Sequence, residues 1–365
     1  MEPTLPRRWG PAGPDIGEPM TTTTGTARRA AAVLAISLLV IVGGAGPAWA
    51  DPAEPTNYQS RVTDVAPFTP YAEVKVVAGD AFLNLAVVPG HTAAVTGYFH
   101  EPYLRFDADG TVWANENSPA FYINRSRFGL GGTPASASAT ATPVWTQVGS
   151  GGRYAWHDHR THWMSPDLPP TVGGTRAEIV FPWDLPIVVD GVETTVSGQL
   201  LWFPSANPVG PIMLGLVGLA PLMFLRRGRI LPIAVAAAIA AGFALLAATA
   251  EYLATPAPGR VIPLTPLVPA LAVVAAVLAI GFDRHPLRAW ASALLSGIGL
   301  VLYSGRSMAT LTAPILPSSL PVALERACVA MAGWVGLAVI LLAITGLWGS
   351  MRINTAEVEA PRDGS

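Results

Sequence analysis

Charged residues are scarce in this chain and thiols are almost absent. Only 13% of the residues are charged, with 24 acidic against 22 basic side chains, so nothing suggests a nucleic-acid partner. The mean hydropathy of +0.43 is too high for a soluble domain and too low for a pure membrane bundle. The single cysteine, Cys328, falls in an apolar segment, so we expect an exported domain held together by its core without a disulfide.

Residues 1–50 are interpreted as a disordered stretch followed by a signal peptide. In order, the segment contains Arg28-Arg29, the apolar run Ala30–Val42, a break at Gly43–Pro47 and the motif Ala48-Trp49-Ala50. This order predicts secretion and cleavage before Asp51. An uncleaved signal anchor is the alternative, and the break argues against it. A chain that starts at Met20 would have a signal-peptide n-region of more ordinary length than one that starts at Met1. Either methionine is therefore a candidate for the first residue of the protein.

Residues 51–206 are expected to form an extracytoplasmic, all-β domain. Short β-branched and aromatic runs are separated by turn signals, and Asp190-Gly191 is typical of a hairpin. Many short strands without a long helical period favour an immunoglobulin-like β-sandwich. The expected strands are Ala72–Val77, Phe82–Val87, Ala93–Phe99, Tyr103–Phe106, Thr111–Asn115, Phe121–Asn124, Val144–Val148, Tyr154–His157, Arg176–Phe181, Ile187–Val189 and Thr194–Phe203.

Residues 207–352 are expected to form an α-helical transmembrane bundle of about five helices, followed by a cytoplasmic tail at 353–365. Each span is close to the roughly 20 residues that cross a bilayer. The segment Ser304–Pro321 is either an outer-face loop or a re-entrant segment. The expected spans are Val209–Leu225, Ile230–Ala254, Leu264–Phe282, Pro286–Tyr303 and Ala327–Ser350.

Arginines predict the orientation of the bundle. They follow the first, third and last spans, and the positive-inside rule places them in the cytoplasm; they are Arg226, Arg227, Arg229, Arg284, Arg288 and Arg352. The chain is therefore expected to be a multi-pass cell-membrane protein with its β domain outside. Its expected partners are the lipid bilayer and other envelope proteins. No ionisable residue lies near the middle of a span, which argues against proton-coupled transport.

The segment Tyr154–Met164, with the sequence YAWHDHRTHWM, is the strongest candidate site. In an extended chain His157 and His159 share one face, and His162 and Met164 form a second such pair. A bend at Arg160-Thr161 would bring the pairs together. Imidazole and thioether ligands suit copper, and the lack of a nearby thiolate argues against a structural zinc site.

His91 and His100 are secondary candidates for the same site, and Asp158 could orient an imidazole ring. The leading alternative is that the same histidines are hydrogen-bonded structural residues; histidines that face the outside can also respond to pH without a metal. A hydrolase is the third reading, because H-x-H-x-x-H echoes the H-x-H-x-D-H signature of metallo-β-lactamase-like enzymes. Thr161 occupies the acidic position and no histidine follows His162 before the membrane, so no enzymatic activity is expected.

Four motifs in the exported domain carry a family resemblance: Asn57–Val62 (NYQSRV), Pro102–Gly110 (PYLRFDADG), Ser118–Asn124 (SPAFYIN) and Trp156–Met164 (WHDHRTHWM). Through them the chain resembles a family of actinobacterial membrane proteins, a resemblance that implies no activity. The layout is also similar to fused copper-resistance proteins of the CopC–CopD type, which implies copper handling. Those proteins begin with a ligand histidine where this chain has Asp51, and their membrane parts have more helices, with histidines in them.

The two leading hypotheses make different predictions. A non-catalytic binding or assembly module of the cell envelope predicts imidazole nitrogens that hydrogen-bond to the backbone. A copper-handling protein predicts that the rings, with His162 or Met164, converge at an accessible surface. A membrane hydrolase would need a cleft with an acid/base pair.

Overall fold

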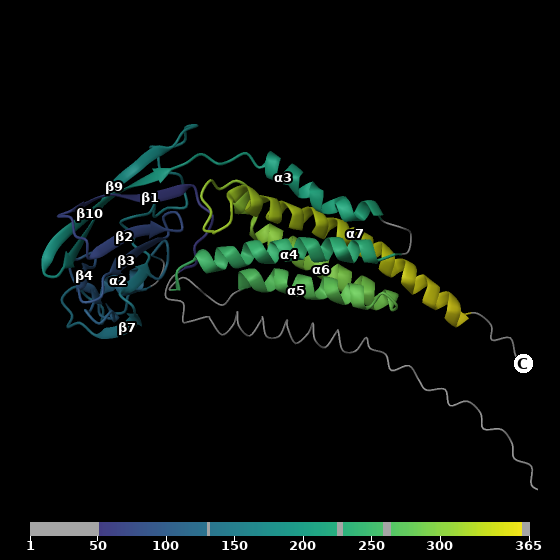
Figure 1. Ribbon diagram of the computed structural model, residues 1–365, viewed down its shortest axis with the longest axis horizontal. Helices are drawn as coiled ribbons and strands as arrows, with labels where there is room; N and C mark the ends of the chain where they lie inside the picture. The colour runs from purple at the N-terminus through teal and green to yellow at the C-terminus, as the bar shows by residue number, and fades with distance from the viewer. Residues whose placement is uncertain (1–50, 130–131, 225–228, 258–263, 360–365) are drawn as a thin grey trace, which may run out of the picture.

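The computed structural model describes residues 51–129, 132–224, 229–257 and 264–359, and places a β domain at one end of a long helical bundle (Figure 1). The expected signal peptide, Arg226, Arg227 and residues 360–365 lie outside the described residues. Both halves expected from the sequence are present in the expected order.

The β domain consists of two antiparallel sheets. The larger has seven strands in the order β1-β10-β9-β4-β5-β6-β7, and the smaller has three in the order β2-β3-β8. The strands are β1 (Tyr58–Ala66), β2 (Ala72–Val77), β3 (Phe82–Val87), β4 (Ala93–Thr96), β5 (Pro102–Phe106), β6 (Val112–Asn115), β7 (Trp145–Gly149), β8 (Arg153–Trp156), β9 (Glu178–Val189) and β10 (Val192–Trp202).

One hydrophobic core joins the two sheets. Leu83, Leu85 and Trp156 from the small sheet pack in the same cluster as Leu104 and Phe106 from the large one. Each of these side chains is at most 2% exposed, and burying one contributes about 1.5–3 kcal/mol. Alternation along each strand sends these residues inward, so the period-2 sequence pattern and the shared core have the same origin.

The β9–β10 hairpin turns at Asp190-Gly191, as expected. Both residues have positive φ, 48° and 81°, which a type I′ turn requires. The two expected strands before it, Arg176–Phe181 and Ile187–Val189, are joined into the single strand β9. Prolines at 182 and 186 are tolerated inside it because β4 pairs only with Ile187–Val189, which leaves the rest of that edge without a ladder to break.

The expectation of a strand at Phe121–Asn124 is wrong. The segment is a short helix, α2 (Pro119–Ile123), and the signal for it lies just upstream. The Ser118 hydroxyl accepts a hydrogen bond from the Ala120 N–H at 3.2 Å, and Pro119 occupies the first helical turn. Strand β1 was not expected, although the Asn57–Val62 motif enters it.

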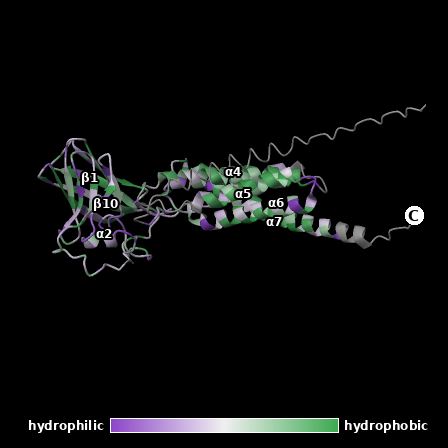
Figure 2. Ribbon diagram, turned by 90° about the horizontal axis from the view of Figure 1, so that it is seen from below, coloured by the Kyte–Doolittle hydropathy of each residue, from purple (hydrophilic) through white to green (hydrophobic). Residues whose placement is uncertain are grey.

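The helical half contains three helices long and apolar enough to cross a membrane, Leu231–Ala254, Pro286–Arg306 and Val322–Arg352, which indicates a membrane protein (Figure 2). The other two expected spans are shorter apolar helices, and the first changes to a 3₁₀ helix that contains Pro221. The elements are α3 (Val209–Gly215), η1 (Leu216–Phe224), α4 (Leu231–Ala254), α5 (Leu264–Gly281), α6 (Pro286–Arg306), η3 (Met308–Leu311) and α7 (Val322–Glu359).

Glycines bring α6 and α7 close together. A Cβ at Gly336 would lie 3.0 Å from the Gly297 carbonyl oxygen, and a Cβ at Gly297 would lie 3.0 Å from the Gly336 oxygen. Small residues are what membrane helices use for such backbone contact. We expect Gly336→Leu to destabilise the full chain by about 1–3 kcal/mol, because the larger side chain has no space. Thermal unfolding in detergent measures this, and Gly349→Leu on the same helix, which has nothing within 4 Å, should melt like the wild type.

The β domain is attached to the bundle through the loop between α6 and α7. The backbones of Thr56 and Ile315 exchange two hydrogen bonds, of 3.0 and 3.1 Å, and the Ala206 N–H donates to the Thr312 oxygen at 2.7 Å. Gly79 of the β domain lies against the Ile315 side chain, and its φ of 79° favours glycine. The segment expected to be an outer-face loop or a re-entrant segment therefore contacts the β domain.

Candidate functional site

A buried turn folds the histidine motif back on itself where β8 ends. The Asp158 carboxylate accepts hydrogen bonds from the Trp156 indole at 2.9 Å and from the Arg160 side chain at 2.7 Å. The Asp158 carbonyl accepts from the Thr161 N–H at 3.0 Å. Burial raises the pKa of Asp158, but the charge and hydrogen bonds of Arg160 outweigh it, so the pKa is lowered and the carboxylate stays ionised. The expected bend at Arg160-Thr161 is this turn.

The turn brings three imidazole rings together. The ring centroids of His159 and His162 are 5.1 Å apart, and those of His157 and His162 are 6.3 Å apart. His157 and His162 are each 1% exposed, and His157 also stacks on Phe82 at 4.3 Å. The sequence expectation that these three residues cluster is therefore consistent with the geometry.

Backbone carbonyl oxygens occupy most of the ring nitrogens. His157 contacts the Ala81 oxygen through Nδ1 and the Asp51 oxygen through Nε2, the latter at 3.0 Å. His159 Nε2 lies 2.9 Å from the Ser126 oxygen, and His162 Nδ1 lies 3.2 Å from the Trp163 oxygen. Within the described parts of the chain, His162 Nε2 is buried without a hydrogen-bond partner. Across the same residues, no group of three or more His, Cys, Asp or Glu side chains is arranged to hold a metal ion.

The other sequence candidates lie apart or at the edge of this cluster. Met164 is 39% exposed and its terminal methyl group, like the His159 ring, lies against Gly129. His91 instead pairs with Asp190 at 2.6 Å and stacks on Tyr71 at 3.7 Å. His100 is in the exposed turn between β4 and β5, with φ of 63°.

A buried ion pair beside the rings was missed by sequence reasoning. Arg127 donates to both carboxylate oxygens of Asp80, at 3.1 and 2.5 Å, and the Asp80 side chain is fully buried. Burial raises the pKa of Asp80, and Arg127 offsets only part of this effect. The sequence showed Asp80 only as half of a turn signal, and nothing local pointed to a partner 47 positions away.

Asp51, the first residue after the expected cleavage point, is fixed against the same group. Its N–H donates to the Arg125 oxygen at 3.1 Å, and its carboxylate accepts from the Arg127 N–H at 2.9 Å. Its carbonyl oxygen is the one that faces His157. Residues 51–56, which we call the strap, thus run from the histidine cluster to the Thr56–Ile315 contact with the bundle.

Electrostatics keep the rings neutral at ordinary pH. Burial lowers the pKa of His157, His159 and His162, and for His162 the nearby Arg127 charge adds to the effect and brings the pKa to about 3. A neutral ring has a single N–H, so His157 can donate to only one of its two carbonyl neighbours at a time.

We expect the protein to lose stability as the pH falls. The folded-state pKa values lie below the ordinary value of 6.5, so the unfolded chain takes up protons first, and stability present above pH 6.5 is lost below it. His162 alone contributes a loss of about 1.4 kcal/mol per pH unit between 6.5 and its folded pKa of about 3. Unfolding of the full chain at pH 7.5 and 5.5 measures this. His162→Gln should flatten the profile; a profile unaffected by this substitution would contradict the assignment.

Comparisons of the chain with family models, curated proteins and solved structures found no match. Functional inference therefore depends on the geometry of these residues.

Proposed function

We propose that this protein is a multi-pass membrane protein of the cell envelope that presents a non-catalytic binding or assembly module on the extracytoplasmic side. The module is the β domain, for which we propose an immunoglobulin-like sandwich, and residues 353–365 are cytoplasmic. The placement of the arginines supports this orientation: Arg229, Arg284, Arg288 and Arg352 lie at the end of the bundle away from the β domain (Figure 1). The lipid bilayer and other envelope proteins are the proposed partners.

The observation that carries the non-catalytic reading is the contact of imidazole nitrogens with backbone carbonyl oxygens. A nitrogen that donates a proton to a carbonyl has no lone pair to offer a metal or a substrate. In His157 one nitrogen donates in this way, and the nitrogen that keeps its lone pair also faces a carbonyl oxygen, so neither is open to a ligand. The two oxygens belong to Ala81 and Asp51, which are far apart in the sequence. The ring is thus a brace between the strap, the start of β3 and the end of β8.

Two observations favour the alternative, a copper-handling protein. His162 Nε2 has no partner among the described residues, although it is buried. The 5.1 Å between the centroids of His159 and His162 is also close to the roughly 5 Å expected for two rings on one metal, with bonds of about 2 Å. Copper would then be held by His159, His162 and Met164, and His157 would act as a brace.

Copper titration of the full chain in detergent separates the two functions. If the β domain is a non-catalytic module, the wild type and the double variant His159→Ala/His162→Ala should take up the same amount of Cu(I). The copper function predicts one equivalent in the wild type that the double variant loses. His91→Ala/His100→Ala is the matched control, because it removes two imidazoles from the same domain outside the cluster.

A further inference from the structure

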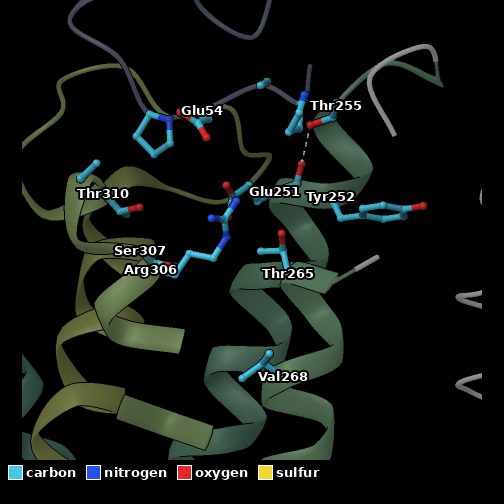
Figure 3. A pocket seen from close by; sticks show the side chains of 13 residues that line it. Glu54, Glu251, Tyr252, Thr255, Thr265, Val268, Arg306, Ser307 and Thr310 are labelled. Carbon is cyan, nitrogen blue, oxygen red and sulfur yellow. Dashed lines mark hydrogen bonds between the residues drawn. The ribbon is translucent and has the colours of Figure 1, made fainter. Parts of the chain in front are cut away.

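A cavity of about 420 Å³ lies where the strap crosses the ends of α4, α5 and α6 (Figure 3). This volume is within the range of small-ligand sites. The strap forms its roof, and the last turn of α4, the first turns of α5 and the α6–η3 junction form its walls. Its polar lining includes Glu54, Glu251, Thr265, Arg306, Ser307 and Thr310.

Side chains of opposite charge face this cavity without forming an ion pair. The Arg306 side chain extends toward Glu251 (Figure 3), yet across the described residues neither the guanidinium nor the Glu251 carboxylate has a hydrogen-bond or ion-pair partner. The charges of Glu325, Arg306 and Glu54 all act on Glu251 over a longer range. Among the described residues of the lining, Arg306 and the carboxylates of Glu54 and Glu251 are therefore available to a charged ligand.

We propose that this cavity binds a phosphoethanolamine group, with the ammonium at Glu251 and Glu54 and the phosphate at Arg306. The ammonium has three N–H donors for the carboxylates, and guanidinium is suited to phosphate. The Ser307 and Thr310 hydroxyls are further donors in the lining. The proposal rests on the proposed orientation, which places these helix ends at the level of the outer headgroups. Phosphatidylethanolamine headgroups and free phosphoethanolamine have the same chemistry.

Other common headgroups fit the same charges less well. Choline has no N–H to donate to the carboxylates. Glycerol headgroups bring a phosphate without a cation, so the Glu54 and Glu251 carboxylates in the lining repel them. A bare divalent cation is repelled by Arg306, which extends into the centre of the group (Figure 3).

Native mass spectrometry of the full chain in mild detergent tests the proposal. We expect phosphatidylethanolamine to bind roughly tenfold more tightly than phosphatidylcholine or phosphatidylglycerol, and Arg306→Gln or Glu251→Gln to remove roughly tenfold of that affinity. Arg284→Gln and Asp283→Asn at the opposite end of the bundle are matched controls and should bind like the wild type. Equal binding of the three lipids, or equal losses in test and control variants, would overturn the proposal.

Two further measurements complete the test. Ala309→Phe fills the cavity while keeping every charge, so it should abolish the preference without lowering the melting temperature; a retained preference overturns the site. Free phosphoethanolamine distinguishes the two sources of the ligand. If it displaces phosphatidylethanolamine at an equal concentration, the site binds a soluble ligand. If only the lipid binds, the site binds a lipid headgroup. Because binding is measured in detergent and orientation with reporters in cells, failure of one is distinguishable from failure of the other.

Discussion

Replacement of Arg127 by methionine is expected to destabilise the β domain by about 3–5 kcal/mol. Asp80 is fully buried, and removal of its partner leaves a carboxylate without compensation. The Arg127 charge also lowers the pKa of the nearby His162, so the substitution should raise that pKa. The backbone N–H of residue 127, which donates to the Asp51 carboxylate, is kept in the variant. Chemical unfolding of the full chain at pH 7 measures the free energy.

An exposed pair in the same domain is the control. Lys75 and Glu73 are 2.6 Å apart, but their side chains are 61% and 60% exposed, so Lys75→Met should cost at most about 1 kcal/mol. The Arg127→Met loss should also shrink in acid, because the buried Asp80 then folds as the neutral acid. Equal losses in the two variants would show that Arg127 does not compensate Asp80.

Reporter fusions after Ser205 and after Arg352 are expected to show that these two positions lie on opposite sides of the membrane. Alkaline phosphatase fused after Ser205 should be active, because the proposed orientation exports the β domain. The same reporter after Arg352 should be inactive, whereas green fluorescent protein there should fluoresce. The first expectation follows from the expected signal peptide, and the second from the arginines at the far end of the bundle. Phosphatase activity after Arg352 would mean that the number of spans or the orientation is wrong.

Elements governed by local pattern could be predicted from the sequence. Strands β2 and β3 have the expected bounds, and the Asp190-Gly191 hairpin depends on two residues that favour positive φ. α4 coincides almost completely with an expected span because apolar length alone defines it. α2 was missed because a run of aromatic and β-branched residues resembles a strand, whereas Ser118 and Pro119 set the helix.

The candidate site could be predicted only in part. Clustering of His157, His159 and His162 follows from their spacing and a bend within the motif. The atoms that face their nitrogens come from elsewhere: the Asp51 oxygen is 106 positions from His157, and the Ala81 oxygen is 76 positions away. Such partners depend on the sheet order and on the path of the strap, which no local pattern specifies.

The prolines of β9 also restrict how another protein can attach. Beyond its short pairing with β4, this long strand presents an edge where Pro182 and Pro186 have no N–H to offer. An incoming peptide therefore cannot continue the ladder there, so recruitment by strand addition is blocked along this edge, as is edge-to-edge pairing of two β domains through it. A partner that binds this edge must therefore contact side chains and not the backbone. Replacement of both prolines would restore backbone N–H donors there and favour aggregation through strand pairing.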